Sequence, residues 1–279
     1  MGGAIVVGIT EAAVTRRAVD WAAQRAAERS QPLELLAVVG GSTGAIGEGS
    51  IVEAALAEAQ VRAEAEASRV AAGGLEVRTR VGRGNPVSRL LEASEEAALL
   101  VIGSDYRGPG SKASRGAHGL RIAAGGHCPV VVVPDFDLTG RSGVLVGVDG
   151  SPTAERAVAF AAAEADRLRE PLVAVSVWTP LEVPRNMGVY PVEYLENLAQ
   201  LTEESLAISL AGLRSQYPDL EIVPRVERGY PSQILNELAA DARLAVVGSH
   251  GRGALARFLL GSISQEVLAR LATATAVVR

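Results

Sequence analysis

Short apolar runs alternate with longer stretches of helical periodicity along the first half of the chain. Residues 4–9 (AIVVGI) are apolar without interruption, which is typical of a strand covered on both faces. Residues 13–29 place Val14, Ala18 and Ala22 at helical spacing. The same reading predicts strands at 4–9, 33–39, 75–81, 99–103 and 129–134, and helices at 13–29, 50–72, 86–97 and 116–124. This alternation predicts an α/β fold with a parallel, doubly wound sheet.

The same pattern begins again in the second half of the chain. Residues 143–149 (GVLVGVD) repeat the first strand, with Gly147 at the place of Gly8, 139 residues earlier. Farther along, Gly248 corresponds to Gly103 with an offset of 145 residues. Both copies keep their apolar strands, so the chain is interpreted as a tandem duplication of one fold.

The two copies are separated by a linker at residues 135–142, which contains Gly140. This predicts two domains, residues 1–135 and 141–279. The second copy is six residues longer, and the difference falls in one loop, between residues 178 and 191. An insertion confined to a loop leaves the shared fold intact.

A buried strand, a glycine-rich loop and a helix start follow one another near the end of the second copy. They are formed by residues 244–247, 248–253 (GSHGRG) and 261–264 (GSIS). Glycines let the backbone approach a ligand closely, and the first amides of a helix lack internal partners and carry the positive end of its dipole. This order predicts an anion site, with the hydroxyls of Ser262 and Ser264 beside a phosphate.

Three side chains of this stretch, His250, Arg252 and Arg257, would add hydrogen-bond donors or positive charge. The stretch lacks the lysine of G-x-x-x-x-G-K-[ST], and no G-x-G-x-x-G follows the first strand of either copy. The alternative is a surface turn that only closes a strand–helix unit.

Asp149 follows the first strand of the second copy and is placed to accept a hydrogen bond from a ribose hydroxyl or an adenine amino group. The alternative is an aspartate that only helps the turn. Asp149, Val177 and Gly248 all lie at the carboxyl ends of predicted strands. Ligands of open parallel sheets bind beyond those ends, where the strand order reverses, so we expect the three residues to border one crevice.

The first copy differs from the second at the positions where a ligand would be touched. It has Thr10 in place of Asp149, Asp105 in place of His250, Tyr106 in place of Gly251 and Ala117 in place of Ser262. Arg107 does match Arg252, which leaves anion contact by the first loop open. We expect that the first copy has lost this site or binds something else.

Composition narrows the class of protein. A length of 279 residues suits two domains that each bury a core, and the single cysteine, Cys128, excludes an internal disulfide framework and fits a reducing cytoplasm. Neither a leader pattern nor a run of the ~18 apolar residues of a membrane span is present. A net charge of −5 argues against sequence-independent binding to nucleic acid, which depends on an excess of basic residues.

The motif Gly248-x2-Gly251-x9-Gly261-Ser262, with Asp149 after the first strand, resembles that of the universal stress protein family, and the duplication resembles its tandem-domain members. The resemblance covers nearly the whole chain. It implies in each domain a five-stranded parallel, Rossmann-like sheet of order 3-2-1-4-5 flanked by helices. The nucleotide-binding subgroup of the family further implies bound ATP, with Mg²⁺ as its usual companion.

Carried over by position, the resemblance assigns Asp149 to the nucleoside, the backbone near Val177 to the adenine, and the loop and helix start to ribose and phosphates. The predicted site comprises Asp149, Val177, Gly248, His250, Gly251, Arg252, Gly253, Gly261, Ser262, Ile263 and Ser264. The family also pairs domains through their fifth strands. We therefore expect residues 129–133 and 274–278 to pair within the chain, with homodimerisation left open.

Together with the features of the chain, the resemblance favours an ATP-binding regulatory protein of the stress response with no dedicated catalytic machinery. The three histidines form no pair at metal-ligand spacing, and the serines follow no G-x-S-x-G elbow. Two alternatives stay open: a slow ATPase or nucleotidyl-transfer enzyme of a related nucleotide-binding class, and a nucleotide-free interaction protein.

Overall fold

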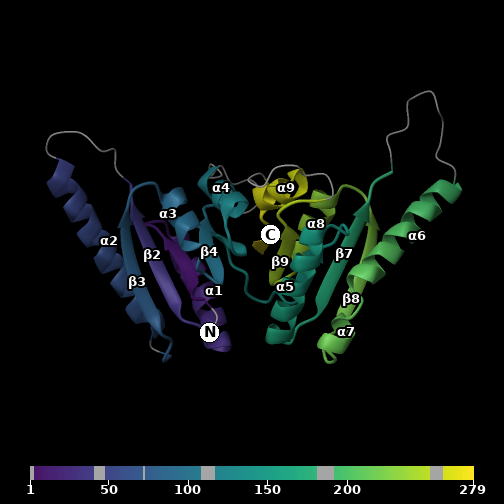
Figure 1. The fold of residues 1–279 in the computed structure, drawn as a ribbon, viewed down its shortest axis with the longest axis horizontal. Helices are drawn as coiled ribbons and strands as arrows, with labels where there is room; N and C mark the ends of the chain where they lie inside the picture. The colour runs from purple at the N-terminus through teal and green to yellow at the C-terminus, as the bar shows by residue number, and fades with distance from the viewer. Residues whose placement is uncertain (1–2, 41–47, 72, 108–116, 181–191, 252–259) are drawn as a thin grey trace, which may run out of the picture. The chain divides into compact units, whose positions relative to one another are not determined.

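The computed structural model describes residues 3–40, 48–71, 73–107, 117–180, 192–251 and 260–279 (Figure 1). The chain forms two compact units, Met1–Asp137 and Leu138–Arg279. No helix within the described ranges is long and apolar enough to cross a membrane.

The first unit contains a five-stranded parallel sheet in the order β3-β2-β1-β4-β5. Its strands are β1 Ile5–Ile9, β2 Leu33–Val39, β3 Val77–Arg83, β4 Leu99–Ser104 and β5 Val130–Pro134. Its helices are α1 Val14–Arg29, α2 Glu48–Ala71, α3 Pro86–Ala93 and α4 Ala117–Gly125. The central strands are buried on both faces, which explains their continuous apolar sequences.

The second unit repeats this arrangement in the order β8-β7-β6-β9-β10. Its strands are β6 Val144–Gly147, β7 Leu172–Trp178, β8 Ile222–Arg228, β9 Leu244–Gly248 and β10 Ala274–Val278. Its helices are α5 Pro152–Leu168, α6 Val192–Ser209, α7 Leu213–Gln216, α8 Pro231–Ala239 and α9 Ser262–Arg270. The predicted α/β class and strand order 3-2-1-4-5 are confirmed.

Two predicted elements, the third strand and the third helix, differ from the structure in their bounds. Strand β3 begins and ends two residues later than expected. Its pairing with β2 runs from Val77 to Arg83, and the exposed face of an edge strand accepts charged side chains. Helix α3 ends at Ala93 rather than residue 97, because the Ser94 hydroxyl bonds the Leu91 carbonyl at 2.6 Å and terminates the last turn.

Helices cover both faces of the second sheet, and Figure 1 shows α6 running along β7 and β8. The space over Gly248 is filled by Thr153 of α5, and the space over Gly147 by Leu235 of α8. Strand β6 pairs with β7 on one side and β9 on the other, so the strand order reverses at β6 and β9. A crevice is expected at the carboxyl ends of these two strands.

Candidate functional site

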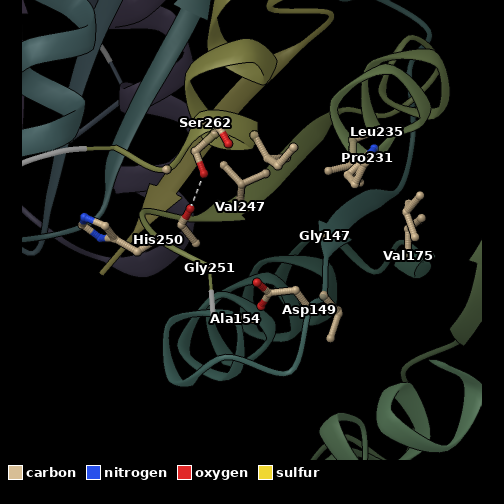
Figure 2. Close-up of a pocket in the computed structure, with 16 residues that line it drawn as sticks. Gly147, Asp149, Ala154, Val175, Pro231, Leu235, Val247, His250, Gly251 and Ser262 are labelled. Carbon is tan, nitrogen blue, oxygen red and sulfur yellow. Dashed lines mark hydrogen bonds between the residues drawn. The ribbon is translucent and has the colours of Figure 1, made fainter. Parts of the chain in front are cut away.

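A pocket of about 480 Å³ opens at the carboxyl edge of the second sheet (Figure 2). It is lined by Gly147, Val148, Asp149, Ala154, Val175, Val177, Pro231, Leu235, Val247, Gly248, His250, Gly251, Gly261, Ser262, Ile263 and Ser264. Nine of the residues predicted from the sequence are brought together here. The other two, Arg252 and Gly253, lie outside the described residues, as does Arg257.

Asp149 is exposed just beyond the end of β6, and its two carboxylate oxygens lie in different surroundings. Oδ1 accepts a hydrogen bond from the backbone N–H of Ser151 at 3.0 Å, which is the turn-forming role. Oδ2 lies 2.6 Å from the position that a Cβ atom on Gly251 would occupy. The two interpretations of Asp149 are therefore compatible, because one oxygen forms the turn while the other faces the glycine loop.

The glycine loop is held at its centre by the start of α5. The His250 carbonyl accepts a hydrogen bond from the Thr153 hydroxyl at 2.5 Å, and the Ser151 hydroxyl lies 3.5 Å from the same oxygen. Ser151 also caps α5, accepting from the Ala154 N–H at 3.2 Å. The helix start that follows Asp149 thus holds the loop, a contact between segments about a hundred residues apart that no local sequence signal predicts.

The two ends of the loop are also fixed. The N–H of Ser249 donates to the Val278 carbonyl at 2.7 Å, and the N–H of Gly261 donates to the Ser249 carbonyl at 2.8 Å. The buried Ser264 hydroxyl donates to the Gly248 carbonyl at 2.6 Å. This hydroxyl proton is already engaged, so Ser264 differs from the expected phosphate donor and offers its backbone N–H instead.

The N-terminus of α9 faces the pocket without a side-chain cap. Its N-cap is Gly261, the first turn contains no acidic residue, and Ser262 is exposed. The fourth amide is satisfied within the helix, since the Gln265 N–H donates to the Gly261 carbonyl at 2.9 Å. The amides of Ser262, Ile263 and Ser264 and the Ser262 hydroxyl therefore form a place suited to an anion.

The opposite part of the pocket is apolar. Its walls come from the end of β7 and the start of α8, where Val175, Val177, Pro231 and Leu235 lie (Figure 2). Of these four residues, only Val177 was predicted from the sequence to border the site. Pro231 at the first position of α8 is a signal of a helix start, but such a signal does not show that the helix side chains border a pocket.

His250 contributes to the loop mainly through its backbone. Its ring is directed away from Asp149 in Figure 2, and Nδ1 lies 2.9 Å from the Ser249 hydroxyl oxygen. Nε2 is buried and has no hydrogen-bond partner among the described residues. The expected donor role of this ring toward a phosphate thus has no support from its orientation.

The first unit arranges the equivalent positions differently. The Tyr106 ring lies edge-on to Phe136 with centroids 6.4 Å apart, and the Arg107 guanidinium pairs with Asp135, Nε to Oδ2, at 2.9 Å. Val14 takes the place of Thr153 and packs over Gly103 without a hydroxyl for the loop. Val14 therefore cannot form the hydrogen bond that Thr153 forms in the second unit, and Arg107 already has a carboxylate partner.

Sequence comparison connects both halves of the chain with one family. The model of the universal stress protein family matches residues 1–134 and again residues 141–279. A universal stress protein of Mycolicibacterium smegmatis is 33% identical over 287 residues, covering 99% of this chain and 96% of that protein. One of Mycobacterium tuberculosis is 33% identical over 290 residues, covering 98% and 95%.

Solved structures show the same fold. A crystal structure of a universal stress protein from Archaeoglobus fulgidus aligns with a TM-score of 0.73 over 99% of this chain and 95% of its own, at 17% sequence identity. At this level of identity the likeness concerns the fold alone.

Proposed function

The chain belongs to the universal stress protein family, and we propose that its second unit binds one ATP molecule in the pocket at the carboxyl ends of β6 and β9. The observation that carries this proposal is the convergence of three features. The Asp149 carboxylate, the uncapped N-terminus of α9 and the apolar wall from β7 and α8 all border the same space. A nucleotide presents the matching groups: sugar hydroxyls, phosphates and a flat base.

The pocket suits ATP in size and in the distribution of its groups. A volume of about 480 Å³ lies within the range of small-molecule sites. The base would lie against Val177 and Pro231, with a ribose hydroxyl donating to Asp149 Oδ2. The amides of Ser262 to Ser264 would hold phosphate oxygens, and Mg²⁺ would arrive with the phosphates as their usual counter-ion.

A regulatory rather than a catalytic role fits the lining residues. The described lining contains a single carboxylate, Asp149, and one of its oxygens is already engaged by the turn. Activation of a water molecule for hydrolysis needs a base positioned next to that water. We therefore propose a nucleotide-dependent switch of the stress response, in which ATP occupancy changes what the chain binds.

Isothermal titration of ATP into the purified protein tests the proposal. We expect one ATP per chain, and Asp149→Asn, which keeps an acceptor for the turn, should weaken binding by about tenfold, or 1.4 kcal/mol. Full affinity in this variant would place the nucleotide elsewhere. ATP turnover on the scale of seconds would favour the alternative of a nucleotide-processing enzyme.

The pairing of the two units is a separate proposal. Strands β5 and β10 are each at an edge of the sheet formed by their own unit, and edge strands need a cover or a partner. We propose that they pair with each other within the chain. A disulfide that forms between single cysteines placed in β5 and β10 would support this, and light scattering would report whether the whole chain also dimerises.

A further inference from the structure

A carboxylate on α9 joins this helix to the start of α8. Glu266 accepts two hydrogen bonds, from the Tyr230 hydroxyl at Oε1 at 3.1 Å and from the Ser232 hydroxyl at Oε2 at 2.5 Å. Ser232 is buried, whereas half of Tyr230 is exposed. The two oxygens of one carboxylate thus hold two residues of the neighbouring helix.

These two helices bear opposite halves of the pocket. Helix α8 contributes Pro231 and Leu235 to the apolar wall, while α9 contributes Ser262 and its neighbours to the anion site (Figure 2). Pro231 lies between the two hydroxyl donors in the sequence. Glu266 lies one helical turn after Ser262, so the contact fixes the spacing between base wall and phosphate site.

The first unit lacks all three residues of this contact. With the offset of 145 residues, Tyr230, Ser232 and Glu266 correspond to Asn85, Val87 and Arg121. Asn85 instead caps its own helix, α3, accepting from the N–H groups of Val87 and Ser88 at 2.9 and 3.2 Å.

Tyr230 makes no such cap on α8, so the second unit forgoes a favourable N-cap at this position. The same side chain instead reaches across to α9. The second unit, which has the glycine loop and Asp149, therefore uses position 230 for a contact between two helices and not for a helix cap.

We propose that Glu266 is a positioning residue that holds α8 against α9, so that base and phosphates of one nucleotide are bound at the same time. This inference rests on the proposed function. A negative charge near a helix N-terminus would by itself oppose phosphate binding, and the two hydroxyl donors keep the carboxylate engaged. The hydrogen bond to Glu266 raises the pKa of the Tyr230 phenol.

The test compares ATP with its two parts. Three variants are titrated with ATP, with adenosine and with inorganic triphosphate: Glu266→Gln, Tyr230→Phe and Ser232→Val. The last of them introduces the residue that the first unit has at this position. Because the contact governs the spacing between two subsites, ATP affinity should fall by about tenfold, while each part alone changes by less than about twofold. Glu237→Gln is the matched control, since it is the same substitution at a carboxylate whose hydrogen bond, from Gln233, lies within α8.

The outcomes separate the explanations. Unchanged or tighter ATP binding by Glu266→Gln would overturn the inference, because the carboxylate would then act only as a repulsive charge. Equal losses for ATP, adenosine and triphosphate would also overturn it, since they would indicate general disruption of the unit. ATP binding by the unmodified protein tests the proposed function, whereas the difference between variants and control tests the role of Glu266.

Discussion

The Oδ2 atom of Asp149 lies 2.6 Å from the place where a side chain on Gly251 would begin. These residues are about a hundred positions apart in the sequence, one after β6 and the other after β9. Glycine at 251 therefore allows the carboxylate to lie against the loop. Since the obstructing atom would be the free end of an exposed side chain, a methyl group here displaces the carboxylate rather than the backbone.

Gly251→Ala should accordingly weaken ATP binding by at least about tenfold without unfolding the protein, because the carboxylate moves away from the ligand. Calorimetric titration measures the affinity and circular dichroism the melting temperature. Gly82→Ala is the control, since a methyl group there meets no atom within 4 Å. Undiminished affinity in the Gly251 variant would show that this approach of carboxylate and loop has no part in binding.

Thr153→Val copies Val14 of the first unit and removes the hydrogen bond to the His250 carbonyl. Loss of one such bond should lower ATP affinity by roughly fivefold, or about 1 kcal/mol, because the loop is less well held. Thr153→Ser should restore most of the affinity. A Ser variant as weak as the Val variant would mean that the threonine methyl, not the hydroxyl, is what matters.

Tyr106→Gly restores glycine at the position in the first unit that corresponds to Gly251. We expect the titration to remain at one ATP per chain with nearly the same affinity, because Thr10, Val14 and Ala117 still differ from the second unit. The change should cost some stability through loss of the ring contact with Phe136. A marked drop in ATP affinity would contradict the assignment of the nucleotide to the second unit.

Burial raises the pKa of Cys128 from 9.0 to about 11. The unfolded thiol ionises near its ordinary pKa, while the folded thiol stays protonated until about pH 11, so the free energy of unfolding should fall as pH rises through this window. The limiting slope is roughly 1.4 kcal/mol per pH unit for one proton. Denaturant titrations of the unmodified protein and of Cys128→Ala at pH 8, 9 and 10 isolate the contribution of the thiol to the free energy of unfolding. If the two proteins differ in this free energy by the same amount at every pH, the prediction is wrong.

Local sequence patterns were sufficient for much of this molecule. The apolar run that contains Val7 must be covered on both faces, and the repeat of Gly8 at Gly147 indicates that the second half folds like the first. The spacing of the glycines, together with Asp149, also predicted nine of the residues that line the pocket. Periodicity and turn chemistry act over a few residues, and such signals can be read without coordinates.

Contacts between distant segments were decided only by the tertiary structure. The hydroxyl of Thr153 reaches a carbonyl 97 residues away, Glu266 bonds a tyrosine 36 residues earlier, and the Ser264 hydroxyl turns inward to Gly248 rather than toward a ligand. Each depends on how helices pack on the sheet. The sequence by itself therefore determined the repeated fold and the position of the glycine loop. Packing decided which hydroxyls hold that loop and which side chains line the pocket, because the whole core sets the direction of side chains and the spacing of helices.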